Sequence, residues 1–409
     1  MKRYDSYKDS GVKWLGEIPS HWKMERWRFL MNENVSKNNN CNVRLQLQFK
    51  YGDIVRKSNQ SEEKDVLETI SKYTVVEPDD IMINGLNLNY DFISQRVARV
   101  REEGAITSAY VSLRPTEIAD SRFYTYFLKS MDAKKMFHGM GTGIRLTLSY
   151  NELKNQFLPK PSIKEQEAIA NYLDSATSKI DEAIAQQQKM IDLLNERKQI
   201  IINNAVTKGL DPNVKMKPSG IDWIGDIPEH WEIRRMRYLC KITTGNKDTI
   251  NRVDDGLYPF YVRSPKVERI NSYSYDGEAV LMAGDGVGAG KVFHYVNGKF
   301  DYHQRVYCFY EIEMIKAKLL YYYMQNLFKY VIEQLSAKST VDSVRLNMIQ
   351  DFVVCIPSIK EQIEIVNFID KEFANIEKAI QISLNQISLL QERKQIIIND
   401  VVTGKVKVV

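Results

Sequence analysis

Two glycine-rich stretches of the chain resemble parts of catalytic loops, but the first has the wrong structural context and the second lacks required residues. Residues 137–141 (FHGMG) fit the loose FxGxG pattern of an S-adenosylmethionine-binding loop, but they follow a predicted helix where that loop should follow a strand. Residues 284–291 (GDGVGAGK) resemble a phosphate loop, yet Asp285 stands where a glycine is required and Val292 where Ser or Thr must hold Mg²⁺. This second stretch therefore predicts a strand–turn–strand connection.

Other residue types that could carry chemistry are present only as isolated residues. Pro78-Asp79 with the distant Asp132 and Lys134 imitates a nuclease signature, but a match this short arises often by chance. The five histidines do not cluster, and the four cysteines show neither a CxxC pair nor zinc spacing, at Cys41, Cys240, Cys308 and Cys355. The sequence predicts no catalytic residue and no metal site, so the chain is interpreted as a binding protein.

Basic and amide side chains, interleaved with aromatic residues, occupy two variable regions at about residues 23–158 and 232–355. Arginine on guanine and Asn or Gln on adenine are the usual base contacts, and Lys or Arg on phosphate adds salt-dependent affinity. The net charge of +5 is compatible with nucleic acid without requiring it. The candidate DNA-binding residues are Arg44, Gln46, Lys50, Asn84, Asn87, Arg96, Thr142 and Arg145 in the first region, and Asn246, Lys247, Arg263, Lys266, Arg305, Lys338, Ser339 and Arg345 in the second.

Two loops within these regions are the strongest candidates. Residues 139–145 and 336–345 are rich in glycine and hydroxyl side chains, and both follow the helix predicted in their own region. Small residues let the backbone approach a ligand closely.

The elements that must position these residues come from an internal duplication. The segment PSIKEQ occurs at residues 161–166 and again at 357–362, and each copy leads into a long apolar pattern that ends near Thr207 or Thr403. Apolar residues recur at alternating steps of three and four, which is typical of a coiled-coil seam. Each copy predicts one helix with a serine cap and a glutamate three residues later.

The connectivity predicts how the two helices run. The first leaves one variable region and leads to the other, and the second starts where the other region ends, so a packed pair must be antiparallel. A helix of this length cannot bury its seam alone, and we expect Ile180, Ile184, Ile376 and Ile380 near the helix–helix contact. The expected organisation is a recognition domain at 1–158, a helix at 159–209, a second domain at 210–356 and a second helix at 357–409.

The duplication extends beyond the helices. SGVKWLGEIPSHW (residues 10–22) recurs as SGIDWIGDIPEHW (residues 219–231), and its tryptophans, Trp14, Trp22, Trp223 and Trp231, are expected to anchor the segment to its own domain. Strand patterns followed by a helix occur in both variable regions, with the helices at about residues 121–137 and 316–335. The predicted fold class is α+β, with two mixed domains joined by two long antiparallel coiled-coil helices and an internal pseudo-twofold.

The remaining composition narrows the class of protein. Hydrophobic residues make up 44% of the chain and charged residues 27%, as in ordinary globular proteins. No run of about 20 apolar residues occurs, and the N-terminus lacks the apolar core of a signal peptide. We therefore expect a cytoplasmic protein without a membrane partner.

Taken together, the paired SGxxWxGxIPxHW segments, the paired PSIKEQ starts and the paired LLxERKQIII ends resemble the specificity subunit of type I restriction-modification enzymes. The resemblance implies that each domain reads one half of a split, asymmetric double-stranded DNA target and that the helices set the gap. It also implies two modification (methyltransferase) subunits docked on the helices, together with restriction/translocase subunits. S-adenosylmethionine, ATP and Mg are expected on those partners, with none bound directly by this chain.

One alternative from another class stays open on the sequence. The chain would then be a scaffold or orphan subunit that holds partner subunits through its helices without reading DNA.

Overall fold

The computed structural model describes residues 2–58, 64–143, 146–336 and 343–408. Contacts divide the chain into two compact units, residues 1–187 with 385–409 (unit 1) and residues 188–384 (unit 2). Both long helices contribute to both units, and the segment boundaries predicted from the sequence stay predictions.

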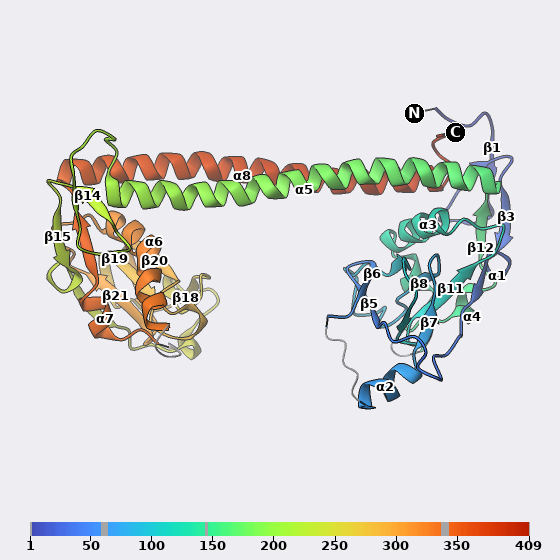
Figure 1. The fold of residues 1–409 in the computed structure, drawn as a ribbon, viewed down its shortest axis with the longest axis horizontal. Coiled ribbons are helices and arrows are strands. Elements are labelled where there is room, and N and C mark those ends of the chain that lie inside the picture. Colours follow the sequence, from blue (N-terminus) through green and yellow to red (C-terminus); the bar gives the residue numbers. More distant parts are fainter. Residues whose placement is uncertain (1, 59–63, 144–145, 337–342, 409) are drawn as a thin grey trace. The chain divides into compact units, whose positions relative to one another are not determined.

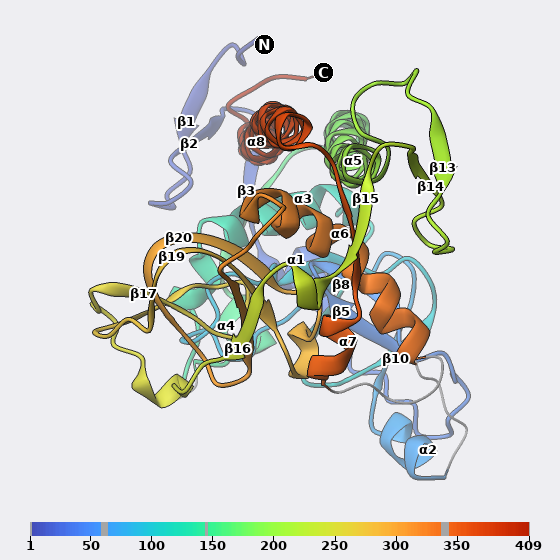
Figure 2. The same ribbon diagram turned by 90° about the vertical axis from the view of Figure 1, so that its left-hand side faces the viewer.

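The two long helices are α5 (Ile163–Lys208) and α8 (Ile359–Val402), and each begins directly after the serine predicted as its cap. In unit 1 the beginning of α5 and the end of α8 share one apolar core, through Ile169 and Val401 among others. In unit 2 the end of α5 and the beginning of α8 do the same, through Ile202 and Ile365. Figures 1 and 2 show the two helices side by side, and the antiparallel pairing predicted from the connectivity is confirmed.

Ion pairs fix the register of the helix pair within each unit. In unit 1 Lys394 Nζ lies 2.7 Å from the carboxylate of Asp181, and in unit 2 Lys198 Nζ lies 3.0 Å from Glu377. The turn of α5 that carries Ile180 therefore lies beside Lys394, and the turn of α8 that carries Ile376 lies beside Lys198.

The four seam isoleucines differ in burial. Ile180 and Ile376 are buried, whereas Ile184 and Ile380 are half-buried. Their burial agrees with a seam position, and a contact among all four stays a prediction.

A glutamine in the duplicated PSIKEQ segment connects each long helix to its own domain. The fully buried Gln166 accepts a hydrogen bond from Asp120 N at 2.8 Å and donates to the carbonyls of Ile118 and Pro161. Gln362 makes the corresponding set with Lys316 N at 2.7 Å and with the carbonyls of Met314 and Pro357. Each side chain satisfies three backbone groups, so both halves use the same joint between domain and helix.

Unit 1 contains a central four-stranded antiparallel sheet in the order β4 (Met31–Glu33), β11 (Val111–Pro115), β8 (Ile81–Ile83) and β9 (Val97–Arg99). Unit 1 also contains four separate two-stranded pairs. They are β1 (Tyr7–Asp9) with β2 (Glu17–Pro19), β3 (Lys23–Arg26) with β12 (Phe157–Lys160), β5 (Leu47–Lys50) with β6 (Asp53–Arg56), and β7 (Thr74–Val76) with β10 (Gly104–Ile106). The helical segments of this domain are α1 (Trp27–Leu30), α2 (Lys64–Ser71), α3 (Ser121–Ala133), η1 (Met136–Gly139) and α4 (Tyr150–Leu153).

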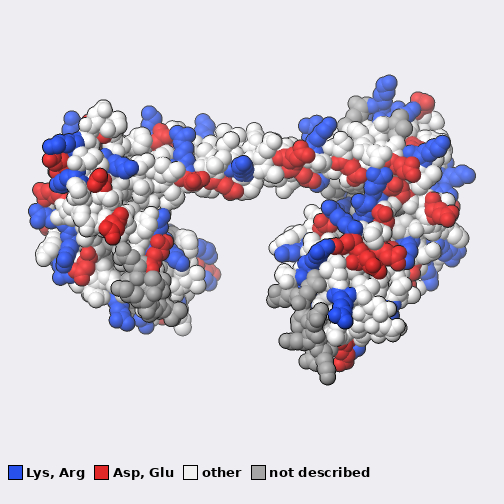
Figure 3. All heavy atoms as spheres, in the orientation of Figure 1, with Lys and Arg blue, Asp and Glu red and all other residues white. Residues whose placement is uncertain are grey.

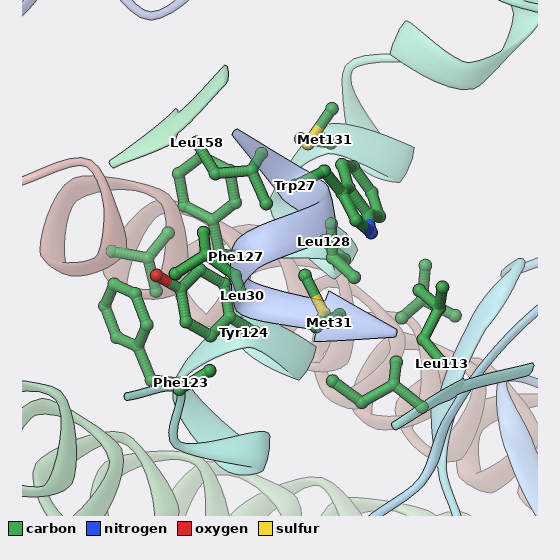
Figure 4. Packing of buried hydrophobic residues seen from close by; sticks show 14 of the residues in the cluster. Trp27, Leu30, Met31, Leu113, Phe123, Tyr124, Phe127, Leu128, Met131 and Leu158 are labelled. Carbon is green, nitrogen blue, oxygen red and sulfur yellow. The ribbon is translucent and has the colours of Figure 1, made fainter. Parts of the chain in front are cut away.

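The core of unit 1 forms where α1 and α3 meet the sheet. Trp27, Phe123, Phe127 and Leu128 are all buried there, and Figure 4 shows them among the apolar side chains around α1. Asp120 caps α3 by accepting from the N–H groups of Arg122 and Phe123, so the helix starts at the predicted position.

Unit 2 contains a six-stranded sheet in the order β16 (Lys241–Thr244), β21 (Val306–Tyr310), β19 (Tyr275–Ala283), β20 (Phe293–Tyr302), β17 (Tyr258–Tyr261) and β18 (Glu268–Ile270). The β17–β20 pair is parallel, whereas the others are antiparallel. Two further strand pairs are β13 (Met216–Pro218) with β14 (Asp226–Pro228) and β15 (Glu232–Arg235) with β22 (Val353–Ile356). The helical segments are η2 (Met236–Tyr238), η3 (Thr249–Asn251), η4 (Gly286–Gly288), α6 (Ala317–Ser336) and α7 (Leu346–Gln350).

The duplicated tryptophans act as anchors within their own units. Trp22 and Trp231 are buried in the apolar cores of unit 1 and unit 2. Trp14 packs on Phe127, and Trp223 stacks on Phe352 with ring centroids 5.7 Å apart. The anchoring role predicted for these residues is confirmed.

Candidate nucleic-acid interface

The glycine-rich turn between β19 and β20 is the centre of the candidate site in unit 2. Gly284 N donates to Arg305 O at 2.8 Å, and Val344 N donates to Gly284 O at 2.7 Å. A Cβ at Gly284 would lie 2.8 Å from the Tyr307 ring, so the close approach requires glycine. The turn thereby joins three distant segments, and its strand–turn–strand geometry confirms the prediction made against a phosphate loop.

The carboxylate of Asp285, which lies on this turn, pairs with two of the predicted arginines. Asp285 Oδ1 lies 3.1 Å from Arg263 Nη1, and Asp285 Oδ2 lies 3.6 Å from Arg305 Nε. Both guanidinium groups remain largely exposed. A planar guanidinium held on one edge by a carboxylate can offer its other N–H groups to a base or a phosphate.

Residues 246–248 reach the same place, because Lys247 pairs in parallel with His303 just beyond the β17–β20 ladder. His303 N donates to Tyr261 O at 2.9 Å, and Gln304 N donates to Lys247 O at 2.8 Å. Gln304 Nε2 also donates to Asp248 Oδ2 at 2.6 Å. These bonds set residues 246–248 beside residues 303–305, so Asn246 and Lys247 lie close to the Arg305 segment.

His303 is a structural member of this group. It is buried, and this burial lowers its pKa, so the ring is neutral near pH 7. Its Nδ1 accepts a hydrogen bond from Arg305 N at 2.9 Å, which fixes the backbone that carries Arg305.

The other predicted residues of unit 2 lie at different distances from this turn. Arg345 is exposed and follows Val344, which is bonded to the turn. Lys266 is exposed and pairs with Glu268 at 3.3 Å, on the connection between β17 and β18. Lys338 and Ser339 lie outside the described residues.

Unit 1 has a loop in the corresponding place, residues 84–96 between β8 and β9. Leu148 N donates to Gly85 O at 2.9 Å, as Val344 N does to Gly284 O in unit 2. A Cβ at Gly85 would lie 2.4 Å from Leu148 O, so here too the close approach requires glycine. The segments after the two domain helices, predicted to be equivalent, hold the two turns with the same backbone contact.

Two residues predicted to contact DNA in unit 1 are buried, and the prediction is wrong for both. Arg96 has 0% exposed area, and its guanidinium donates to the carbonyls of Asn84, Leu86 and Asp91 at 3.0, 2.8 and 2.7 Å. Gln46 is buried, and its backbone bridges to Ala105. Both side chains are polar, but they are buried inside the domain and cannot contact a ligand on its surface.

The remaining predicted residues of unit 1 are at or near the surface. Asn84 is half-buried and accepts from Leu86 N, while Arg44, Lys50, Asn87 and Thr142 are exposed. Lys50 Nζ lies 5.5 Å from the centre of the Tyr51 ring. Arg145 lies outside the described residues.

The turn that follows Lys50 abuts the loop at residues 84–96. A Cβ at Gly52 would lie 2.2 Å from Oε1 of Gln95, so the two segments are in direct contact. The exposed end of the β5–β6 hairpin and the loop therefore form one surface.

On the side of each unit that Figure 3 shows, charges of both signs are mixed rather than gathered by sign. Figure 3 shows Lys and Arg interspersed with Asp and Glu on the visible side of each unit.

Among the described residues no group of three or more His, Cys, Asp or Glu could hold a metal ion. Within that same part of the chain, no helix has the length and apolar character to cross a membrane.

Some residues exposed or paired at these two turns were missed by sequence reasoning. Asp285 was noted only as a mismatch to a phosphate loop, and the exposed Tyr90, Ile93 and Val287 were not selected because apolar residues usually indicate core. Apolar residues next to turn-forming Asn, Asp or Gly were the signal that could have identified them.

Comparison with known proteins gives consistent matches. The family described as type I restriction modification DNA specificity domain matches the chain twice, at residues 34–191 and 228–386. The type I restriction enzyme EcoDI specificity subunit of Escherichia coli is 32% identical over 182 residues, which is 44% of this chain and 40% of that protein. The MjaVIII specificity subunit of Methanocaldococcus jannaschii is 24% identical over 365 residues, 83% of this chain and 81% of that one.

A solved structure extends the similarity to the fold. Its description concerns the structural basis of complex assembly and conformational transition in the type I R-M system. One of its chains superimposes on this chain with a TM-score of 0.72 at 14% identity. The superposition covers 95% of this chain and 99% of that chain.

Proposed function

This chain belongs to the type I restriction-modification DNA specificity family, and on that premise we propose that it is the subunit that reads a bipartite DNA target. Unit 1 reads one half-site and unit 2 reads the other. The variable regions have diverged from each other, so the two half-sites differ and the target is asymmetric. The family match favours this function over a scaffold that does not read DNA.

The observation that carries the proposal is the pair of equivalent turns. In both units a turn of the sheet is held by the segment after the domain helix through the same backbone bond. In unit 2 this turn gathers Arg263 and Arg305 on Asp285. Two turns that are held by the same backbone bond but carry different side chains fit two domains that recognise different DNA sequences.

The partners follow from the duplicated part of the chain. The long helices occur twice with matching sequence, so they offer two similar surfaces, which suits two modification subunits. Restriction/translocase subunits complete the assembly. We propose that S-adenosylmethionine, ATP and Mg bind to those subunits and that this chain contributes recognition without catalysis.

Arg305→Ala tests the reading role of unit 2. An arginine that is bidentate to guanine contributes about 1–3 kcal/mol of discrimination, so we expect one position of the second half-site to lose roughly 5- to 150-fold of its selectivity. The first half-site should keep its selectivity. The measurement is equilibrium binding of the full chain, with modification subunits, to single-base variants of its target at two salt concentrations.

The control is Arg234→Ala, which removes an exposed arginine of the same unit on β15, paired there with Glu232. A uniform loss of affinity with a salt slope lower by about one would assign Arg305 to a phosphate instead. Loss spread evenly over both half-sites would contradict two independent readers.

A further inference from the structure

The loop at residues 84–96 exposes large apolar side chains, while hydrogen bonds to the domain hold its backbone in place. The side chains of Tyr90 and Ile93 are 78% and 94% exposed. Leu88, in contrast, is fully buried in the core of unit 1. One end of the loop is thus anchored in the domain, while its tip presents apolar surface to the outside.

Arg96 connects separate parts of the loop from inside the domain. Its three hydrogen bonds reach the carbonyls of Asn84, Leu86 and Asp91, so one side chain gathers both ends of the loop. Its own N–H donates to Asp132 Oδ2 at 2.7 Å. Burial raises the pKa of Asp132, and the carboxylate is held in place inside the domain.

A second set of bonds shapes the tip itself. The Asp91 carboxylate accepts from Ile93 N at 3.1 Å and from Ser94 N at 2.9 Å. Hydrogen bonding by Ser94 lowers the pKa of Asp91 to about 2, so the carboxylate stays charged at neutral pH. Phe92 stacks on His138 with ring centroids 4.6 Å apart. The conformation that exposes Tyr90 and Ile93 is therefore set before any ligand arrives, which lowers the ordering cost of binding.

Unit 2 places an apolar residue at the corresponding tip. Val287 is 97% exposed in the turn held by Val344, directly after Asp285 and Gly286. In that unit Asp285 of the same turn holds Arg263 and Arg305, which come from the segments after β17 and β20. Val287 therefore lies two residues along the chain from the carboxylate that holds both arginines.

We propose that Tyr90 and Ile93 are specificity-determining residues that read the first half-site by apolar contact in the major groove, with Arg96 as the positioning residue of their loop. Val287 makes the corresponding contact in the second half-site. The thymine C5-methyl group is the apolar feature of a base edge in that groove, and it distinguishes T·A from the other pairs. This inference rests on the proposed DNA-reading function.

Replacing thymine by uracil removes only that methyl group, so it tests the contact directly. The probes are duplexes of the target selected by the full chain with its modification subunits, each with one thymine changed to uracil. We expect the wild type to lose about fourfold in affinity at one position of the first half-site, the value for burying one methyl group. Ile93→Ser or Tyr90→Ser should bind the thymine and uracil duplexes equally at that position.

Variants of the other unit and of the support complete the experiment. Val287→Ser should abolish a uracil effect in the second half-site only. Arg96→Lys keeps a cation but replaces the two nitrogens that span the three carbonyls by one, so it should remove the uracil effect in the first half-site and leave the second unchanged. Thermal unfolding measured alongside detects a variant that has simply lost its fold, and the two serine variants at exposed positions keep the test independent of Arg96.

The possible outcomes distinguish failure of this inference from failure of the proposed DNA-reading function. Specific binding in which the uracil effect persists in Ile93→Ser and Tyr90→Ser would overturn the inference alone. Unchanged DNA discrimination together with weaker assembly would assign the tip to a protein partner and also overturn it. Absence of any sequence-specific binding by the wild-type complex would overturn the proposed function itself.

Discussion

A protein with seven extra residues in each long helix is expected to recognise the same two half-sites with a longer gap between them. The insertions are placed after Ala185 in α5 and after Leu390 in α8. Asp181 pairs with Lys394, so a position four residues further along α5 faces one about four residues earlier in α8. Seven residues keep the apolar seam in register and add about 10 Å of helix, close to three base-pair steps.

The original target should bind this variant at least about a hundredfold more weakly, because losing even a few base contacts costs about 1–3 kcal/mol each. Selection from a random duplex pool measures both the half-sites and the gap. The control is a seven-residue insertion after Pro212, in the exposed turn between α5 and β13, which leaves both helices unchanged. A changed half-site sequence, or an unchanged gap, would show that the helix pair does not set the spacing.

Trp231→Ala should destabilise unit 2 by about 3–5 kcal/mol, the usual cost of removing a buried tryptophan side chain. Trp231 is 1% exposed and packs in the core that joins the domain to the end of α5 and the beginning of α8. Hydrogen exchange measured by mass spectrometry should show lost protection in residues 188–384, with the sheet of unit 1 unaffected. Discrimination in the second half-site should fall while that in the first persists.

The matched control is Tyr238→Ala, since that side chain is exposed in the same unit. If both substitutions cost the same, the tryptophan is not the anchor that its burial indicates. If protection falls equally in both units, they do not act as separate folding units.

The parts of the fold that sequence predicts well are those set by local pattern. The period of the apolar residues and the repeated PSIKEQ starts located the beginnings of α5 and α8, because helix capping and seam periodicity depend on neighbours along the chain. The connectivity then determined their antiparallel direction. The turn at residues 284–291 was also predicted correctly, from the absence of the residues that a phosphate loop needs.

The site was harder to predict because it depends on distant pairings. Arg263 and Arg305 meet on Asp285 only because β17 pairs in parallel with β20, and no local pattern reveals that pairing. Arg96 was assigned to DNA because it is basic, whereas its three acceptors are carbonyls of a loop whose shape the sequence does not show. Polarity marks a side chain as able to bind, and only the fold decides whether it faces inward.

Selection of bound sequences from a random duplex pool, using the full chain with its modification subunits, tests the central claim most directly. The account predicts a bipartite target with two different half-sites separated by a gap of fixed length and no base preference. It also predicts that Arg305→Ala changes the second half-site only and Ile93→Ser the first only. A single uninterrupted motif, two identical half-sites or no enrichment at all would contradict it.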